Sequence, residues 1–150
     1  MIRAFFAGFL LATGLIAVSA QSSMPPAFFM AGQDISAAVD ESAGSRPGMQ
    51  VGRISNTDDY RINMIHRTSS ANPISHERGT EIHFITAGSG TLVTGGVIVE
   101  DGQGNRTVSG GQAREVKQGD FVLVPDATPH WYSDVEDSVT YLEVRFYPDE

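Results

Sequence analysis

The 150-residue chain carries a formal net charge of −8 at pH 7, has no cysteine and is 41% hydrophobic. This length predicts one domain, and without disulfides its stability must come from a buried core. An acidic chain with no basic stripe argues against nucleic acid or an anionic membrane surface as a partner.

The first twenty residues have the pattern of a secretory signal peptide. Arg3 supplies a positive charge, residues 4–18 are almost wholly apolar, and Val18-Ser19-Ala20 fits a cleavage site. An uncleaved membrane anchor is the alternative, but the apolar run is short for a spanning helix. We therefore expect residues 1–20 to be removed and the protein to be exported, either to the periplasm or out of the cell. We expect no membrane partner after cleavage.

Residues 21–49 are expected to form an N-terminal extension and linker before the domain. Asp34 can cap a short helix with three apolar side chains on one face, Ile35, Ala38 and Val39. Phe28 and Phe29 are expected to pack over the end of a barrel or against a partner subunit, because large apolar side chains are usually covered.

From residue 50 the pattern changes to short strands separated by turns rich in Gly, Asn and Asp. The predicted strands are 50–55, 60–67, 81–86, 91–94, 97–100, 113–117, 121–124 and 139–147. Residues 131–133 are expected to lead from the last turn into a polar loop. Many short strands with no helix among them predict an all-β antiparallel sandwich or barrel over residues 50–150.

Two distant stretches carry the side chains suited to chemistry. Residues 76–90 place His76, Glu81 and His83 before an apolar strand that ends in glycines, and residues 119–130 form a strand, a proline-marked turn and then His130. Two imidazoles and a carboxylate that converge from separate strands form a metal site of the two-histidine, one-carboxylate type. The sequence therefore predicts His76, Glu81 and His130 as ligands of one metal ion.

The two stretches resemble the two motifs of the cupin superfamily, and the resemblance covers residues 50–147. The matching positions are His76, Glu81 and Gly88 in the first motif and Gly119, Pro125 and His130 in the second. Four positions depart from the motifs: Thr68 and Ala127 replace glycines, Ile74 replaces the first histidine and Asp134 replaces an asparagine.

This resemblance implies a single-domain jelly-roll β-barrel, or double-stranded β-helix, with a metal held inside it. Three protein ligands would leave positions open for water or substrate, as a catalytic metal requires. The ligand types suit Fe, Mn, Ni or Zn without choosing among them.

The expected function is a small-molecule enzyme of the dioxygenase, isomerase or lyase type. A non-catalytic module that binds a small ligand is the alternative, and a barrel that serves only assembly is a weaker one. The resemblance also suggests a homodimer.

Two further residues are catalytic candidates. His83 follows Glu81 by two positions and so shares its face of the strand. It can act as a fourth ligand in place of Ile74 or as a general acid or base, while the plainer alternative is an inert histidine in the pocket wall. Tyr132 shares a face with His130 and can donate its hydroxyl to a substrate.

The pattern leaves two alternatives for the orientation of two other strands. His66 shares an apolar face with Ile62 and Met64, and a hydrogen-bonded core histidine is favoured over one that faces the cavity. The last strand has one apolar face, Leu142, Val144 and Phe146, and one polar face, Tyr141, Glu143 and Arg145. We expect the polar face to look outward, because apolar triplets usually face the core. If it looks inward, Arg145 becomes a clamp for a substrate carboxylate.

Overall fold

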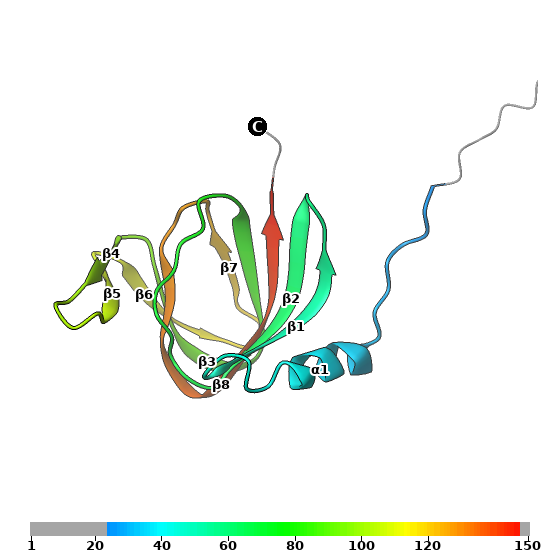
Figure 1. The fold of residues 1–150 in the computed structure, drawn as a ribbon, viewed down its shortest axis with the longest axis horizontal. Coiled ribbons are helices and arrows are strands. Elements are labelled where there is room, and N and C mark those ends of the chain that lie inside the picture. The colour runs from blue at the N-terminus through cyan, green and yellow to red at the C-terminus, as the bar shows by residue number, and fades with distance from the viewer. Residues whose placement is uncertain (1–23, 148–150) are drawn as a thin grey trace, which may run out of the picture.

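The computed structural model describes residues 24–147, so the predicted signal peptide lies outside the described residues. One short helix is followed by strands that curve into a barrel (Figure 1). The elements are α1 Gly32–Glu41, β1 Met49–Asn56, β2 Tyr60–Arg67, β3 Thr80–Thr94, β4 Val97–Glu100, β5 Arg106–Ser109, β6 Gln112–Lys117, β7 Phe121–Val124 and β8 His130–Phe146. The predicted all-β antiparallel barrel is confirmed.

The barrel is built around the pairing of β3 with β8. These two strands pair antiparallel along nearly their whole lengths, from Thr80 opposite Phe146 to Thr94 opposite His130. The other edge of β3 pairs with β7 through its first half and with β6 through its second half. The main sheet has the order β1-β2-β8-β3-β6, and β4 and β5 form a separate hairpin.

The prediction of short separate strands in these regions was wrong. Residues 81–86 and 91–94 belong to one strand of fifteen residues, and residues 131–147 lie almost wholly within one strand of seventeen. Register shifts near Ala87 and Gly90 let the paired strands bend without ending. The glycines that we took as strand breaks are therefore the points where the sheet curves. Strand β5 was not predicted.

Helix α1 packs against the outside of β1. Its N-cap is Ala31, and the predicted cap Asp34 lies in the first turn. There its negative charge interacts favourably with the positive end of the helix dipole. Val39 is the buried residue of the helix and lies directly over Gly52, where a Cβ atom would overlap it. Phe28 and Phe29 remain 64% and 83% exposed, so this chain does not cover them with its own barrel end. Their packing against a partner subunit stays a prediction.

An apolar cluster fills one part of the barrel interior. It contains Ile65, Ile85, Leu92, Val116, Tyr132, Val139 and Tyr141. A second set of buried side chains is polar or charged: Asn63, Arg67, Glu81, His83, His130, Glu143 and Arg145. Such groups are rarely buried without partners, so their contacts define a candidate functional site. Within residues 24–147, no helix has the length and apolar character needed to cross a membrane.

Replacing Gly88 by alanine should destabilise the fold at the bend of β3. Gly88 has a φ of +70°, and an added Cβ would overlap the carbonyl oxygen of Ser138 on β8. Left-handed strain and overlap with the backbone should together lower the free energy of unfolding by roughly 2 kcal/mol or more, as urea denaturation would show. Gly102→Ala is the matched control, because no atom lies within 4 Å of its added Cβ. A change confined to about 0.5 kcal/mol in both variants would contradict this account of the bend.

Candidate metal centre

Glu81 is the centre of the buried polar cluster. It lies on β3, is 2% exposed, and alternates with buried His83 and Ile85 along the inner face of the strand. Its register partner on β8 is Arg145. Because side chains alternate between the faces of a strand, the pairing brings the Glu81 carboxylate and the Arg145 guanidinium together inside the barrel.

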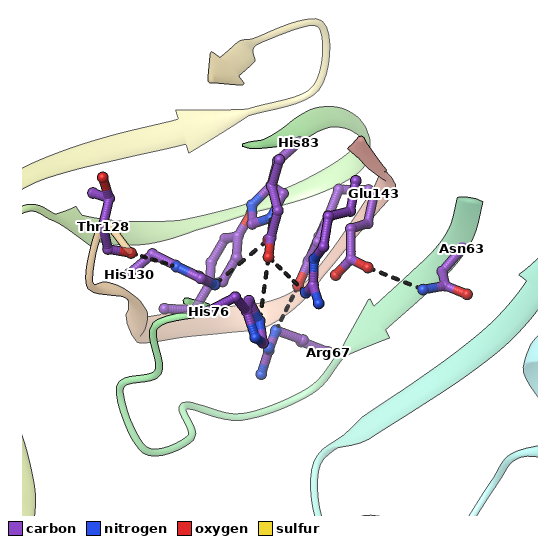
Figure 2. Close-up of polar contacts among 11 residues, drawn as sticks. Asn63, Arg67, His76, His83, Thr128, His130 and Glu143 are labelled. Atoms are coloured by element: carbon purple, nitrogen blue, oxygen red, sulfur yellow. Dashed lines mark hydrogen bonds and ion pairs between the residues drawn. The ribbon is translucent and has the colours of Figure 1, made fainter. Parts of the chain in front are cut away.

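Three histidines, His76, His83 and His130, lie close together in the barrel interior (Figure 2), and each has a ring nitrogen near the Glu81 carboxylate. His76, in the loop before β3, places Nε2 3.2 Å from Glu81 Oε1. His130, the first residue of β8, places Nε2 3.5 Å from Glu81 Oε2. The potential ligand atoms of His76, Glu81 and His130 all lie within 4.8 Å of one another. The structure thus brings the three predicted ligands together, and metal binding by them stays a prediction.

The backbone around His130 fixes the state of its imidazole ring. His130 Nδ1 lies 3.1 Å from the carbonyl oxygen of Thr128. A carbonyl oxygen can only accept a hydrogen bond, so we assign the proton to Nδ1, which leaves a lone pair on the Nε2 atom that faces Glu81. A second contact that leaves one ring nitrogen free in this way is typical of metal-binding histidines.

The turn before His130 also orients His76. Ala127 occupies the position of a motif glycine and adopts a left-handed conformation, with a φ of 55°, which glycine reaches without strain. Its backbone N–H donates to the carbonyl oxygen of His76 at 2.8 Å, and two backbone hydrogen bonds join Ile74 to His130. The turn therefore links the two segments that carry the histidines.

The donor set fits a divalent transition metal. Glu81 Oε1 is buried and has no hydrogen-bond partner, since its 2.6 Å contact with Arg145 Nη2 is a close ion pair without hydrogen-bond direction. An unsatisfied buried oxygen beside two imidazole nitrogens is the donor chemistry that Fe, Mn, Ni and Zn accept. His76, Glu81 and His130 are therefore the residues suited to hold such an ion.

Burial and charge hold these groups in the protonation states that a metal requires. Burial lowers the pKa of both His76 and His130, although the nearby Glu81 charge opposes the shift. Both imidazoles are therefore neutral near pH 7. Burial alone would raise the pKa of Glu81, but the His83 hydrogen bond and the His130 and Arg145 charges bring it to about 2. At neutral pH Arg145 is the cation that balances the carboxylate.

His83 and Tyr132 form a hydrogen-bonded chain behind Glu81. His83 Nε2 lies 3.1 Å from Glu81 Oε2, and its Nδ1 lies 3.3 Å from the Tyr132 hydroxyl. Burial raises the pKa of Tyr132, so its hydroxyl keeps its proton and donates to Nδ1, while His83 Nε2–H donates to the carboxylate. Both ring nitrogens of His83 thus have partners. The catalytic roles suggested for these two residues stay predictions, and their contacts favour positioning of Glu81.

The expected outward orientation of the last strand was wrong. Glu143 and Arg145 are 8% and 7% exposed and face the interior, and Asn63 Nδ2 donates to Glu143 Oε1 at 2.9 Å. On the opposite face Phe146 is 45% exposed. The apolar triplet faces outward because β8 pairs with the strands that carry Glu81 and Asn63, and their inward polar groups supply partners for its charges.

Comparison with known proteins identifies the fold. No family model matches the chain, and no curated protein matches it significantly. Among solved structures, KdgF from Halomonas sp. is 19% identical with a TM-score of 0.51, and the match covers 69% of this chain and 84% of KdgF. A cupin superfamily protein from Desulfitobacterium hafniense is 12% identical with a TM-score of 0.50, over 69% of this chain and 81% of that one. The Fe(II) form of HppE is 14% identical with a TM-score of 0.53, and the match covers 66% of this chain and 51% of HppE. The chain has the cupin fold.

His66 lies outside the interior of this cupin barrel. Along β2 the buried residues are Asn63, Ile65 and Arg67, so His66 points to the opposite face, which α1 partly covers. His66 Nδ1 lies 2.8 Å from the Thr140 hydroxyl. His66 is hydrogen-bonded as expected, but it is half-buried on the outer face and not a core residue, because the interior face of β2 is the one that carries Asn63 and Ile65. His66 therefore cannot replace the ligand missing at Ile74.

Arg61 and Arg67 are site residues that the sequence analysis missed, whereas it named Arg145 as the less favoured alternative. A cavity of about 240 Å³ opens beside His76 in the cupin barrel, and its lining includes Arg61, Arg67 and Arg145. The spacing of these residues held a usable signal, because Arg61, Asn63 and Arg67 share one face of their strand by alternation. The sequence analysis considered only the other face of this strand, which carries His66.

Acid should remove the stabilisation that the buried Glu81 carboxylate provides. Its pKa is lower in the folded chain, at about 2, than its ordinary value of 4.5. Protonation therefore favours the unfolded chain, and this stabilisation is complete above pH 4.5 and is lost as the pH falls toward 2. The free energy of unfolding, measured with urea across this range, should fall less steeply in Glu81→Gln than in the wild type.

Glu100→Gln is the control for this experiment, because Glu100 is exposed on the β4–β5 hairpin. It should keep the acid response of the wild type. If Glu81→Gln loses as much stability between pH 4.5 and pH 2 as the wild type, the buried ion pair does not have the role assigned to it.

Proposed function

We propose that this protein is a metal-dependent enzyme that acts on a small molecule, with one divalent transition metal held by His76, Glu81 and His130. The main observation in support is that three side chains of the types that bind metal ions meet beside an open cavity. Three protein ligands leave positions open for substrate or water, as catalytic sites require. Fe, Mn, Ni and Zn all suit this ligand set.

When bound, the metal supplies Lewis-acid polarisation of an oxygen-bearing substrate or, if it is redox-active, chemistry with dioxygen. The chain's own residues prepare the site for it. The Thr128 carbonyl keeps the proton on His130 Nδ1, and Arg145 offsets the Glu81 charge. His83 and Tyr132 hold the carboxylate from behind. Dioxygenase, isomerase and lyase reactions are all compatible with this arrangement.

The barrel interior favours a ligand-binding role over one in assembly alone. A barrel used only for assembly should be filled with apolar side chains, whereas seven polar or charged residues are buried here. Burying such groups costs stability unless they are fully paired, so a barrel used only for assembly gains nothing from them. A non-catalytic small-ligand binder is the second candidate. A ligand that raises the melting temperature of the protein equally with and without the metal would favour this second candidate.

A homodimer is part of the proposal. The outer faces of β3, β7 and β8 expose four large apolar side chains, Phe84, Phe121, Leu123 and Phe146. Phe84 and Phe121 are register partners on adjacent strands, and Leu123 shares the face of Phe121, so these three side chains form one patch. Contiguous apolar patches on a protein surface commonly mark a protein interface.

Export is also part of the proposal and rests on residues 1–20 alone. Arg3, the apolar run after it and the small residues before Gln21 support a cleaved signal peptide. The proposed cellular location is the periplasm or the exterior.

Mass measurements test both of these points. Protein recovered from the periplasm or medium of an expressing bacterium should have the intact mass of a chain that begins at Gln21. Light scattering should give twice the chain mass, and the double variant Phe121→Ser with Leu123→Ser should give the mass of one chain. A retained N-terminus contradicts the export proposal, and a monomeric wild type contradicts the dimer.

Loss of a proposed ligand should remove the metal without unfolding the chain. We expect about one transition-metal ion per chain in the wild type after loading, as elemental analysis would measure. His76→Ala, His130→Ala and Glu81→Gln should each bind the metal more than about tenfold more weakly, because each removes a direct ligand. Circular dichroism should confirm that each variant remains folded.

His66→Ala is the matched control, because this histidine lies on the outer face of β2 and bonds Thr140. It should keep the full metal content. If no transition metal can be loaded into the folded wild type, or if the metal is lost equally from the His66 variant, the proposed metal site is wrong.

A further inference from the structure

The cavity beside His76 concentrates the positive charge of an acidic protein. Its lining includes five arginines, Arg46, Arg53, Arg61, Arg67 and Arg145. The whole chain has only ten lysines and arginines and a net charge of −8. Half of its cationic side chains therefore line one cavity, and the one carboxylate in that lining is Glu143. A concave surface lined by one sign of charge attracts ligands of the opposite sign.

Two of these arginines are held by contacts within the barrel. Arg145 pairs with Glu81, and Arg67 Nε donates to the Tyr141 hydroxyl at 2.9 Å. The Arg67 guanidinium also lies over the Tyr132 ring, 5.3 Å from its centroid. The side chains of these two residues are thus fixed at the inner end of the cavity.

The other three arginines have no such partners. Within residues 24–147, the side chains of Arg46, Arg53 and Arg61 make no hydrogen bond and no ion pair. Arg61 lies directly opposite Arg145 in the β2–β8 register, although facing like charges on adjacent strands are destabilising. Unpaired, mutually repelling guanidinium groups around a cavity would be stabilised by an anion between them.

Two buried polar atoms in the lining also lack partners. Arg145 Nε and Asn63 Oδ1 belong to residues that are 7% and 5% exposed, and neither atom has a hydrogen-bond partner. A buried donor without a partner costs free energy, so such atoms point to an occupant that satisfies them. Arg145 Nε is a donor suited to an anionic oxygen.

The strand register places the unpaired arginines in line with the candidate metal centre. Arg61, Arg145 and Glu81 form one row across β2, β8 and β3. His76 lines the same cavity, and Ile74 gives it an apolar wall at the position of the missing motif histidine. One molecule in this cavity can therefore direct one end toward His76 and the other toward Arg61 and Arg53.

We infer that the substrate or ligand of this cavity is a small organic dianion, either a dicarboxylate or a phosphate monoester. One anionic group faces His76 and the second pairs with Arg61 and Arg53. Guanidinium groups bind carboxylates and phosphates through paired charge-assisted hydrogen bonds. The cavity of about 240 Å³ is smaller than pockets that take drug-sized molecules, so a ligand of a few carbon atoms suits it. The anionic group that faces His76 would lie at the proposed metal, and this part of the inference rests on the proposed function.

Calorimetry with defined probes tests the inference on the full-length protein, both metal-loaded and chelator-treated. Succinate and glycerol 3-phosphate are the dianionic probes, and succinamide is the neutral probe of similar shape. We expect at least one dianion to bind and succinamide not to bind. Arg61→Gln and Arg53→Gln should each weaken the binding of that dianion by roughly tenfold, because each removes a charged partner. Added salt should weaken the binding as well.

Arg106→Gln is the matched control, because Arg106 lies on the exposed β4–β5 hairpin away from the cavity. It should leave dianion binding unchanged, and the Arg61 variant should keep the metal content of the wild type. Failure of both dianions to bind overturns the inference. So does equal binding of succinamide, or wild-type affinity in the Arg53 and Arg61 variants.

The two proposals fail in different ways. If the wild type binds metal but neither dianion, only the ligand class is wrong. If it binds no metal but the chelator-treated protein binds a dianion through Arg61, the metal proposal is wrong and the arginine site stands as that of a binding module.

Discussion

The ion pair between Glu81 and Arg145 is the constraint around which the barrel interior is arranged. Burying a carboxylate in a protein interior costs several kcal/mol unless cations and hydrogen-bond donors surround it. Arg145 supplies the charge, His83 donates a hydrogen bond, and two more imidazoles approach within 3.5 Å. The pair also requires β3 and β8 to meet in one register, because a shift by one residue would turn Glu81 away from the interior.

The same two strands carry the candidate site and the apolar core. On β3, Glu81 and His83 are followed by Ile85 and later by Leu92, and on β8 the polar Glu143 alternates with Tyr141. Tyr132 and Tyr141 join the two regions, since their rings stack at 5.0 Å while their hydroxyls contact His83 and Arg67. The apolar cluster thus supplies stability that the polar cluster lacks, and it holds the polar side chains in place.

The charge of the whole chain and the charge of the cavity have opposite signs. The overall balance of −8 argued against polyanionic partners, which is a statement about the surface as a whole. It did not predict the character of the cavity, which is lined by five arginines from the segment before β1 and from strands β1, β2 and β8. Net charge is a sum over the sequence, whereas the field in a cavity depends on which residues the fold places there.

The sequence by itself determined the strand-rich class of fold and the ligand types, because turn residues and the spacing around Glu81 and His130 are local features. It also placed Glu81 with His83, and Glu143 with Arg145, on shared faces. The tertiary structure decided which of those faces looks inward. Alternation with a period of two shows which side chains lie together but not which side is covered, and that depends on the strands that pair with β8 and β2. The outward position of His66, the inward position of Arg145 and the arginine-lined cavity all follow from this choice.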